Sequence, residues 1–325
     1  MADPRAIVRV VRSGLQESEH EVDIAVADDR GRLVARAGNA RRTVFARSSM
    51  KPVQAAVSLS RIRHRLTDRQ VAIMCASHNG EGVHVRVVRS LLASAGLDES
   101  ALGNPPGWPL DRDAATRVRG PSRIRHNCSG KHAGMVAASV AAGWQIETYL
   151  RPSHPLQKRI LVAVRGATGL ERIDVGVDGC GVPVFGMPLL AMATVFARLA
   201  RPARLGELEP HVVRATEAMR AHPYLVAGRR REDTAIMQIV PGLVVKSGAE
   251  ALICAADTGS GLGVAVKVVD GGDRAAPPVL LRVLQLLGIV SERRIERLDR
   301  FARPWVTGGG RRVGQVVAEV RLSSR

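Results

Sequence analysis

The sequence predicts an α/β (α+β) fold, built on a mixed, mainly antiparallel sheet flanked by helices. Segments rich in β-branched residues occur near both ends of the 325-residue chain, and most segments between them have a helical pattern. Hydrophobic residues make up 46% of the chain but aromatic residues only 3%, so valine, alanine, leucine and isoleucine build the core. Such a core suits helices packed on a sheet. We expect residues 1–325 to form a single domain, in which sheet-forming terminal segments enclose a helix-rich middle.

The individual elements follow from local patterns. Strands are predicted at 7–11 and 22–27, and Asp28-Asp29-Arg30-Gly31 marks a turn after the second. Helices are expected at 49–63, 67–76, 83–95, 131–142, 155–168, 188–200, 205–222 and 278–288, with Thr67 as an N-cap. Further strands are expected at 243–245, 251–255, 263–269 and 313–320, and residues 103–107 form a Pro/Gly loop. No internal repeat or low-complexity tract interrupts this order.

The net charge of +18 comes from 48 lysines and arginines against 30 acidic residues, and nearly all the cations are arginines. They are scattered, and the tightest groups are 229–231, 293–294 and 311–312. No aromatic residues interleave with these groups to stack on bases, so we expect no specific nucleic-acid binding. A non-enzymatic polyanion-binding protein remains an alternative.

The compartment is predicted from the cysteines and the apolar runs. Cys75, Cys128, Cys180 and Cys254 are too few in this length for a secreted disulfide scaffold. No basic segment leads into an apolar signal-length stretch at the N-terminus, and no apolar run is long enough to span a membrane. We expect a cytoplasmic protein without membrane contact.

Ser48-x-x-Lys51 is the most informative short pattern. Residues three apart are neighbours on a helix, so a hydroxyl nucleophile and an amine base can lie side by side. The apolar run after Lys51 would bury the amine and favour its neutral form. With Ser77-His78-Asn79 and Lys246-Ser247-Gly248, the pattern also matches the motif set of penicillin-recognising enzymes. Against this alternative, that class has a whole helical lobe between its first two motifs, where this chain has about two dozen residues.

Two further segments carry chemistry. Cys128-Ser129-Gly130-Lys131-His132 and Asp178-Gly179-Cys180-Gly181 each place a thiol beside glycine, and thiolates are good zinc ligands. Lys131 or His132 could supply a third ligand, whereas buried structural cysteines are the simpler alternative. Lys267 lies in the apolar run 261–272, where burying a lysine is costly without a partner. It is either an edge-strand lysine that reaches solvent or a second amine directed into a site.

Together these segments resemble the L-asparaginase II family, the rhizobial inducible-type asparaginases. The matching stretches occur in the expected order along nearly the whole chain: RSSMKPVQ (47–54), CASHNGE (75–81), HNCSGKHAGM (126–135), SHPLQ (153–157), VDGCGVP (177–183), MRAHP (219–223) and GLGVAVKVVDGG (261–272).

The resemblance implies a serine β-lactamase/glutaminase-like fold forming one catalytic domain, and hydrolysis of L-asparagine to L-aspartate and ammonia. It implies two Ser–Lys tandems, Ser48 with Lys51 and Ser77 with Lys267. It also implies zinc bound by Cys128, Lys131 and Cys180, and a homodimer. Substrate-binding residues carried over from the family are Arg47, Asn79, His132 and Asp178. A glutaminase of the same fold is a further alternative.

Two segments depart from the family pattern. A Gly-rich bridge commonly follows the His-Pro segment, but this chain has Arg229-Arg230-Arg231 there, which we expect to alter substrate access or specificity. The family position of Ser247 is more often hydrophobic, so we interpret Lys246-Ser247-Gly248 as a scaffold strand.

Overall fold

A computed structural model describes residues 4–324 and separates into two compact units. Unit 1 comprises Met1–Ser49, Gly186–Arg201 and Ala235–Arg325, and unit 2 comprises Met50–Phe185 and Pro202–Thr234. Both ends of the chain therefore belong to unit 1.

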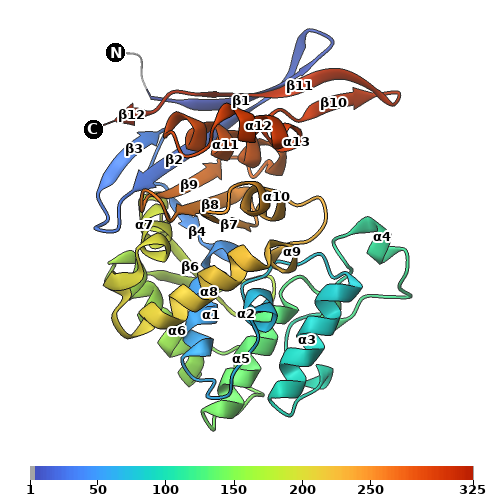
Figure 1. Ribbon diagram of the computed structural model, residues 1–325, viewed down its shortest axis with the longest axis vertical. Coiled ribbons are helices and arrows are strands. Elements are labelled where there is room, and N and C mark those ends of the chain that lie inside the picture. Colours follow the sequence, from blue (N-terminus) through green and yellow to red (C-terminus); the bar gives the residue numbers. More distant parts are fainter. Residues whose placement is uncertain (1–3, 325) are drawn as a thin grey trace. The chain divides into compact units, whose positions relative to one another are not determined.

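Unit 1 is built on a nine-stranded sheet (Figure 1). Its main path runs in the order β10-β11-β1-β2-β9-β8-β7, and β3 pairs with both β2 and β12. Neighbouring strands in it pair antiparallel, and β1 lies between β2 and β11, so the two ends of the chain share one sheet. The strands are β1 (Ala6–Arg12), β2 (Leu15–Ala27), β3 (Leu33–Ala37), β7 (Leu243–Gly248), β8 (Leu252–Asp257), β9 (Gly263–Val268), β10 (Trp305–Gly308), β11 (Arg311–Val320) and β12 (Ser323–Ser324).

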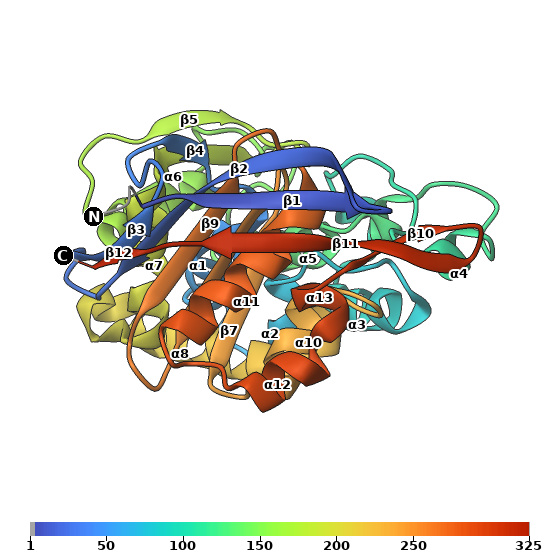
Figure 2. The same ribbon diagram turned by 90° about the horizontal axis from the view of Figure 1, so that it is seen from above.

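Two apolar helices pack on this sheet (Figure 2). Helix α7 (Leu189–Ala200) contacts β2, β8 and β9, and α11 (Ala276–Leu286) contacts β8, β9 and β11. A Cβ at Gly263 would lie only 2.0 Å from the Ala193 carbonyl oxygen, so glycine permits the close approach of α7 to β9. Unit 1 also contains η5 (Asp273–Ala275), α12 (Glu292–Arg297), α13 (Asp299–Ala302) and the short strand β4 (Thr43–Phe45), which pairs with residues 186–188 of β6 (Pro183–Pro188).

Unit 2 is mainly helical. Helix α1 (Lys51–Leu59) is buried along its whole length and contacts α5, α6 and α8. The surrounding elements are α2 (Asp68–Met74), α3 (Gly82–Ser94), η2 (Glu99–Ala101), α4 (Arg112–Ala115), η3 (Arg123–Arg125), α5 (Ser129–Ala141), α6 (Pro155–Thr168), β5 (Asp174–Val177), η4 (Pro202–Leu208), α8 (Glu209–Ala221) and α9 (Pro223–Val226). The division between the units falls within η1 (Arg47–Met50), α10 (Glu232–Ile239) and β6.

The antiparallel sheet with packed helices confirms the predicted fold class. Helix α6 has the predicted bounds, and Thr67 caps α2 in a reciprocal capping box with Gln70. The prediction of one helix over 205–222 is wrong at its start: Gly206, with φ 55° and ψ −129°, interrupts the chain within η4, and the α-helix α8 begins only at Glu209. Within residues 4–324, none of the helices combines the length and apolar character needed to cross a membrane.

Candidate active site

The side chains of Lys51 and Ser77 meet in unit 2. Lys51 is the first residue of α1 and is fully buried. Pro52 follows it in the first turn, where the missing N–H has no intrahelical partner in any case. The Nζ atom of Lys51 donates to Ser77 Oγ at 2.9 Å and to the Ala76 carbonyl at 2.5 Å. A buried amine therefore lies directly against a serine hydroxyl.

Ser77 is held in place by a second chain segment. It follows the end of α2 in an extended stretch, where its N–H donates to Val226 O at 2.9 Å. The Asn79 N–H donates to Ala227 O at 2.7 Å, and its side-chain Nδ2 donates to Arg229 O at 2.9 Å. Asn79 is buried, so the structure gives this predicted substrate-binding amide contacts within the protein.

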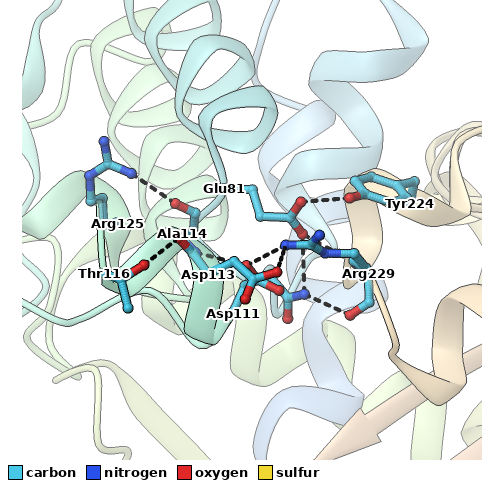
Figure 3. Close-up of polar contacts among 10 residues, drawn as sticks. Glu81, Asp111, Asp113, Ala114, Thr116, Arg125, Tyr224 and Arg229 are labelled. Carbon is cyan, nitrogen blue, oxygen red and sulfur yellow. Dashed lines mark hydrogen bonds and ion pairs between the residues drawn. The ribbon is translucent and has the colours of Figure 1, made fainter. Parts of the chain in front are cut away.

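An ionic network lies beside this stretch (Figure 3). Arg229 Nη2 is 2.8 Å from Asp111 Oδ1 and 2.9 Å from Asp113 Oδ2. The Arg229 N–H donates to Glu81 Oε1 at 3.2 Å, and the Tyr224 hydroxyl donates to Glu81 Oε2 at 2.5 Å. Burial alone would raise the pKa of Asp111, but hydrogen bonds from Arg229 and a backbone N–H hold it below its ordinary value. The network ties the arginine-rich segment to the loop that contains Asp111.

His78 is a residue whose importance the motif analysis missed. Its Nδ1 accepts from the Gly80 N–H at 3.1 Å, so Nε2 carries the proton and donates to Ser129 Oγ at 3.0 Å. His78 also stacks on His84 with ring centroids 5.1 Å apart. Burial, with the nearby His84 and Lys51, lowers the pKa of His78 well below its usual value. The neutral ring therefore fixes the residue after Ser77 to the start of α5, and its place between Ser77 and Asn79 was the available sequence signal.

The predicted metal ligands gather next to Lys51. Cys128 precedes the first residue of α5, Lys131 lies in the first turn, and Lys131 Nζ donates to Cys180 Sγ at 3.1 Å. A hydrogen bond with Cys180 lowers the pKa of Cys128 well below its usual value; burial opposes this shift, and the charges of Lys51 and Lys131 reinforce it. Cys128, Cys180, Lys51 and Ser77 all belong to unit 2. Because Lys51 interacts with both Ser77 and Cys128, the two pairs form one cluster.

Two neighbouring thiols and an amine offer sulfur and nitrogen donors of the kind that zinc, a borderline-soft metal, accepts. To bind a metal, the Lys131 amine would first have to lose a proton, and it donates to Cys180 in this structure. Across residues 4–324, no group of three or more histidine, cysteine, aspartate or glutamate side chains is arranged to hold a metal ion. The predicted ligands Cys128, Lys131 and Cys180 fall outside that definition, because the third ligand is a lysine.

The neighbouring polar residues complete this region of unit 2. His132 Nδ1 is 2.6 Å from the Tyr149 hydroxyl, which also accepts from the Gly103 N–H at 2.7 Å. Burial lowers the pKa of His132 to about 4, so its ring is neutral near pH 7. Cys180 Sγ lies 3.6 Å from Asp178 Oδ2. His132 and Asp178 thus border the thiol cluster.

Ser48 and Arg47 belong to unit 1. Arg47 has φ 45°, a left-handed conformation that is uncommon for a residue with a side chain. The Ser49 hydroxyl is buried and donates to Lys246 O at 3.1 Å, and a Cβ at Gly248 would lie 3.0 Å from Ser49 Oγ. Ser48 is half-buried, and its hydroxyl makes no hydrogen bond within residues 4–324. Of the two adjacent serines, Ser48 is therefore the one whose hydroxyl is available to a substrate.

Lys267 also belongs to unit 1. It lies on β9 opposite Asp23 of β2 and Leu252 of β8. Its Nζ donates to the carbonyls of Glu250 and Val268, each at 2.5 Å. Burial lowers the pKa of Lys267 from its ordinary value. The amine thus supports the turn before β8, and its predicted tandem with Ser77 stays a prediction.

Similarity to solved structures is limited to the path of the chain. A β-lactamase from Mycobacterium bovis is 16% identical with a TM-score of 0.44, and the match covers 82% of this chain and 94% of that one. A putative β-lactamase from Bacteroides dorei is 13% identical with a TM-score of 0.42, over 87% and 94% of the two chains. A glutaminase from Bacillus subtilis is 15% identical with a TM-score of 0.36, over 83% and 89%. These similarities indicate nothing about the substrate of this chain.

No match was found among curated protein sequences. The family model described as L-asparaginase II matches residues 8–318, which is nearly the whole chain. The chain therefore belongs to the L-asparaginase II family.

Proposed function

We propose that this protein hydrolyses the side-chain amide of L-asparagine to L-aspartate and ammonia through a covalent acyl-enzyme. Family membership over residues 8–318 supports an amidohydrolase. The observation that carries the proposed chemistry is the buried Nζ of Lys51, 2.9 Å from the Ser77 hydroxyl, which supports Lys51 as the base. Such a pair supplies a proton acceptor where a serine-dependent amidohydrolase requires one. The choice of Ser48 as nucleophile is carried over from the Ser48-x-x-Lys51 motif.

In the proposed reaction, Ser48 Oγ attacks the amide carbon and its proton passes to neutral Lys51. The C–N bond then breaks, Lys51 returns the proton to the departing ammonia, and an ester to Ser48 remains. Water then attacks this ester and gives a proton to Lys51. The bond from the acyl carbon to Ser48 Oγ breaks, Lys51 passes the proton to Ser48 Oγ, and aspartate leaves with neutral Lys51 and the free serine restored. Backbone N–H groups at the start of the Ser48 helix are the proposed donors to the oxyanion. The Ser49 N–H is an exception, because it already donates to Ala46 O.

Ser77 is proposed to relay the proton of Lys51 or to hold the amine in position, and its contact with Nζ supports this role. We keep Lys267 as the second lysine of the proposed machinery. Its contacts with two backbone carbonyls give it a supporting position on β9 in unit 1.

For substrate binding, we propose that Arg47 receives the α-carboxylate, because a guanidinium pairs with carboxylate in a bidentate fashion. Asp178 would receive the α-ammonium group and His132 would contribute to affinity. Asn79 is proposed to act indirectly, since its side chain holds the Ser77 stretch against Arg229.

We propose that Cys128, Lys131 and Cys180 hold zinc. When bound, zinc would supply a Lewis acid that orients the substrate, while the nucleophile remains a serine. Elemental analysis of purified wild type is expected to find zinc, and Cys128→Ser and Cys180→Ser are each expected to lose it. Unchanged metal content in both variants would contradict the ligand assignment.

The decisive experiment measures ammonia release from L-asparagine and L-glutamine by wild type and by the Ser48→Ala, Ser77→Ala and Lys51→Met variants. Turnover of asparagine that is abolished in Ser48→Ala would support both the reaction and the nucleophile. A diazoketone analogue of asparagine, followed by peptide mapping, would locate the modified serine independently of turnover. Modification of Ser77 in active wild type would move the nucleophile there.

A second candidate activity is acylation by penicillin. One observation favours testing it: the end of β7, with Lys246-Ser247-Gly248, lies against the serine segment through the hydrogen bond from Ser49 to Lys246 O. Intact-mass measurement after incubation with benzylpenicillin would detect an acyl adduct. A stable adduct without release of ammonia from either amide would favour this activity. Hydrolysis of glutamine in preference to asparagine would instead retain the mechanism and change the substrate.

We also propose a homodimer, which light scattering on the purified protein would test. The cytoplasmic location stays a prediction.

A further inference from the structure

A groove in unit 2 lies at the end of α1 remote from Lys51. It has a volume of about 710 Å³ and is bordered by the C-terminal end of α1, α6, η4 and the start of α8. Volumes of about 300–1,000 Å³ are typical of sites for small molecules and cofactors. Since Lys51 begins α1, whereas Val57 and Ser60 line the groove, this hollow is separate from the Lys51–Ser77 cluster.

Basic side chains surround the groove from every bordering element. The charged ones are Arg61 after α1, Lys158 and Arg159 on α6 and Arg204 in η4, and His211 on α8 also lines the groove. Glu207 is the only acidic residue among the lining residues. Like charges that face one hollow with so little acidic compensation produce a concentrated positive potential.

The neighbourhood of His211 reflects this potential. Burial lowers the pKa of His211, and the charges of Arg61 and Arg214 lower it further. Within residues 4–324, the Lys158 amine makes no hydrogen bond or ion pair, and it is exposed. A ligand with clustered negative charge would meet the Lys158 amine together with the neighbouring arginines of the lining.

Part of the lining of the groove is apolar. Val57, Val162, Ala163, Leu205 and Leu208 line it, and Val162 is 66% exposed although it lies on a packed helix. A purely inorganic anion would leave these side chains in water. A flat or apolar group attached to the anion would cover them and gain about 25 cal/mol for each Å² removed from water.

We propose that this groove binds a small organic polyphosphate, with its phosphates on the α6 and η4 cations and its organic body on the apolar part of the lining. Arginine matches the geometry of phosphate oxygens, and several cations suit several adjacent charges better than a single carboxylate. A free amino acid fits less well, because its ammonium group would have only Glu207 as an acidic partner.

The test is isothermal titration calorimetry of magnesium-free ATP and of inorganic tripolyphosphate with the full chain. The decisive variant is Lys158→Glu with Arg159→Glu, on the exposed side of α6. Its matched control is Arg293→Glu with Arg294→Glu, an adjacent exposed pair on α12 with the same change of charge. Far-UV circular dichroism of both double variants verifies folding.

We expect the dissociation constant of ATP to rise at least about tenfold in the α6 variant, because contacts with the ligand are lost there. In the α12 control it should stay within about twofold of the wild-type value, because only the net charge changes. Tripolyphosphate is expected to bind more weakly than ATP, and Val162→Asn is expected to remove most of this difference. Equal weakening by both double variants would show nonspecific attraction to a basic protein and overturn the proposal. So would undetectable ATP binding, or tripolyphosphate that binds as tightly as ATP. Because binding is measured without turnover, these outcomes do not depend on the proposed amidohydrolase activity.

Discussion

At Gly130, one added methyl group should disturb both the packing of unit 2 and the cluster of Lys51, Ser77, Cys128 and Cys180. It lies in the first turn of α5, between Cys128 and Lys131. A Cβ at this position would lie 2.1 Å from the carbonyl oxygen of Ile73 and 2.8 Å from its Cγ1. Since Ile73 belongs to α2, glycine is what lets the start of α5 approach the helix that leads to Ser77.

The size of the effect of Gly130→Ala follows from these distances. A close C···O contact is about 3.3 Å, so the start of α5 would have to retreat by about 1.2 Å from the backbone of α2. Overpacking of this kind costs about 1–3 kcal/mol, and we expect the upper part of that range because a backbone carbonyl cannot rotate away. The same retreat would move Cys128 and Lys131 relative to Lys51, and a misplacement of about 1 Å near reacting groups can cost about a hundredfold in rate.

Gly166→Ala provides the matched control. Gly166 also lies in a helix of unit 2, but a Cβ there meets no atom within 4 Å. Alanine is favoured over glycine inside a helix by about 0.5–1 kcal/mol, so this variant should be slightly more stable than wild type.

Urea unfolding followed by circular dichroism would measure the free energy of unfolding of wild type and both variants, with ammonia release measured in parallel. The two variants should differ by about 1.5–4 kcal/mol, with Gly130→Ala the less stable and the only one to lose activity. If their stabilities agree within about 0.5 kcal/mol, α5 and α2 are not packed as closely as described and the reasoning fails.

Three further predictions concern other contacts of unit 2. Arg229→Ala removes the contacts with Asp111 and Asp113, so we expect kcat for ammonia release to fall about tenfold. The control variant Arg117→Ala, at a neighbouring arginine, should have a kcat near that of wild type. A lower Tm with unchanged kcat in Arg229→Ala would contradict this prediction. The pKa of Asp111 is lowered in the folded protein, so its contribution to stability is present above about pH 4 and is lost as the pH falls further. Urea unfolding at pH 6 and at pH 3 would measure this loss. The free energy of unfolding should decrease less between the two pH values in Asp111→Asn than in wild type. Thr67→Ala removes the cap of α2 and should lower the free energy of unfolding by about 1 kcal/mol, whereas Thr67→Ser should change it little.

Elements specified by local signals could be predicted from the sequence. Thr67 offers both a capping hydroxyl and a glutamine three residues later, and the structure has that capping box. Pro155 marks the start of α6 and Gly169, at φ 77°, its end, so the predicted bounds are correct. Each of these signals acts within one turn of the helix and needs no partner elsewhere in the chain.

Predictions were wrong where one residue changed the backbone path within a continuous apolar pattern. Residues 205–222 have a helical pattern, but Gly206 adopts a positive φ inside η4, so the regular helix α8 starts only at Glu209. The short strands β4, β5 and β6 were missed, because strands of 3, 4 and 6 residues give little alternation to recognise.

The candidate site was predictable as a set of residues but not as a set of contacts. The motifs contain Lys51, Ser77, Cys128 and Cys180, and the structure brings these four together in unit 2. The contact of Lys51 with Ser77 depends on a backbone pairing of Ser77 with Val226, about 150 residues away, and no local pattern announces that pairing. The positions of His78 and Glu81 depend on the same long-range arrangement.

The two arginine-rich regions of unit 2 differ in how their charge is compensated. Arg229 contacts Asp111 and Asp113, so its charge is neutralised locally. Around the groove at the end of α1, three arginines and a lysine line the hollow with one acidic side chain, Glu207. These are four of the 48 lysines and arginines of the chain. In our proposal the cations at the groove serve to bind a ligand, whereas the pairing of Arg229 with two aspartates holds two segments of unit 2 together.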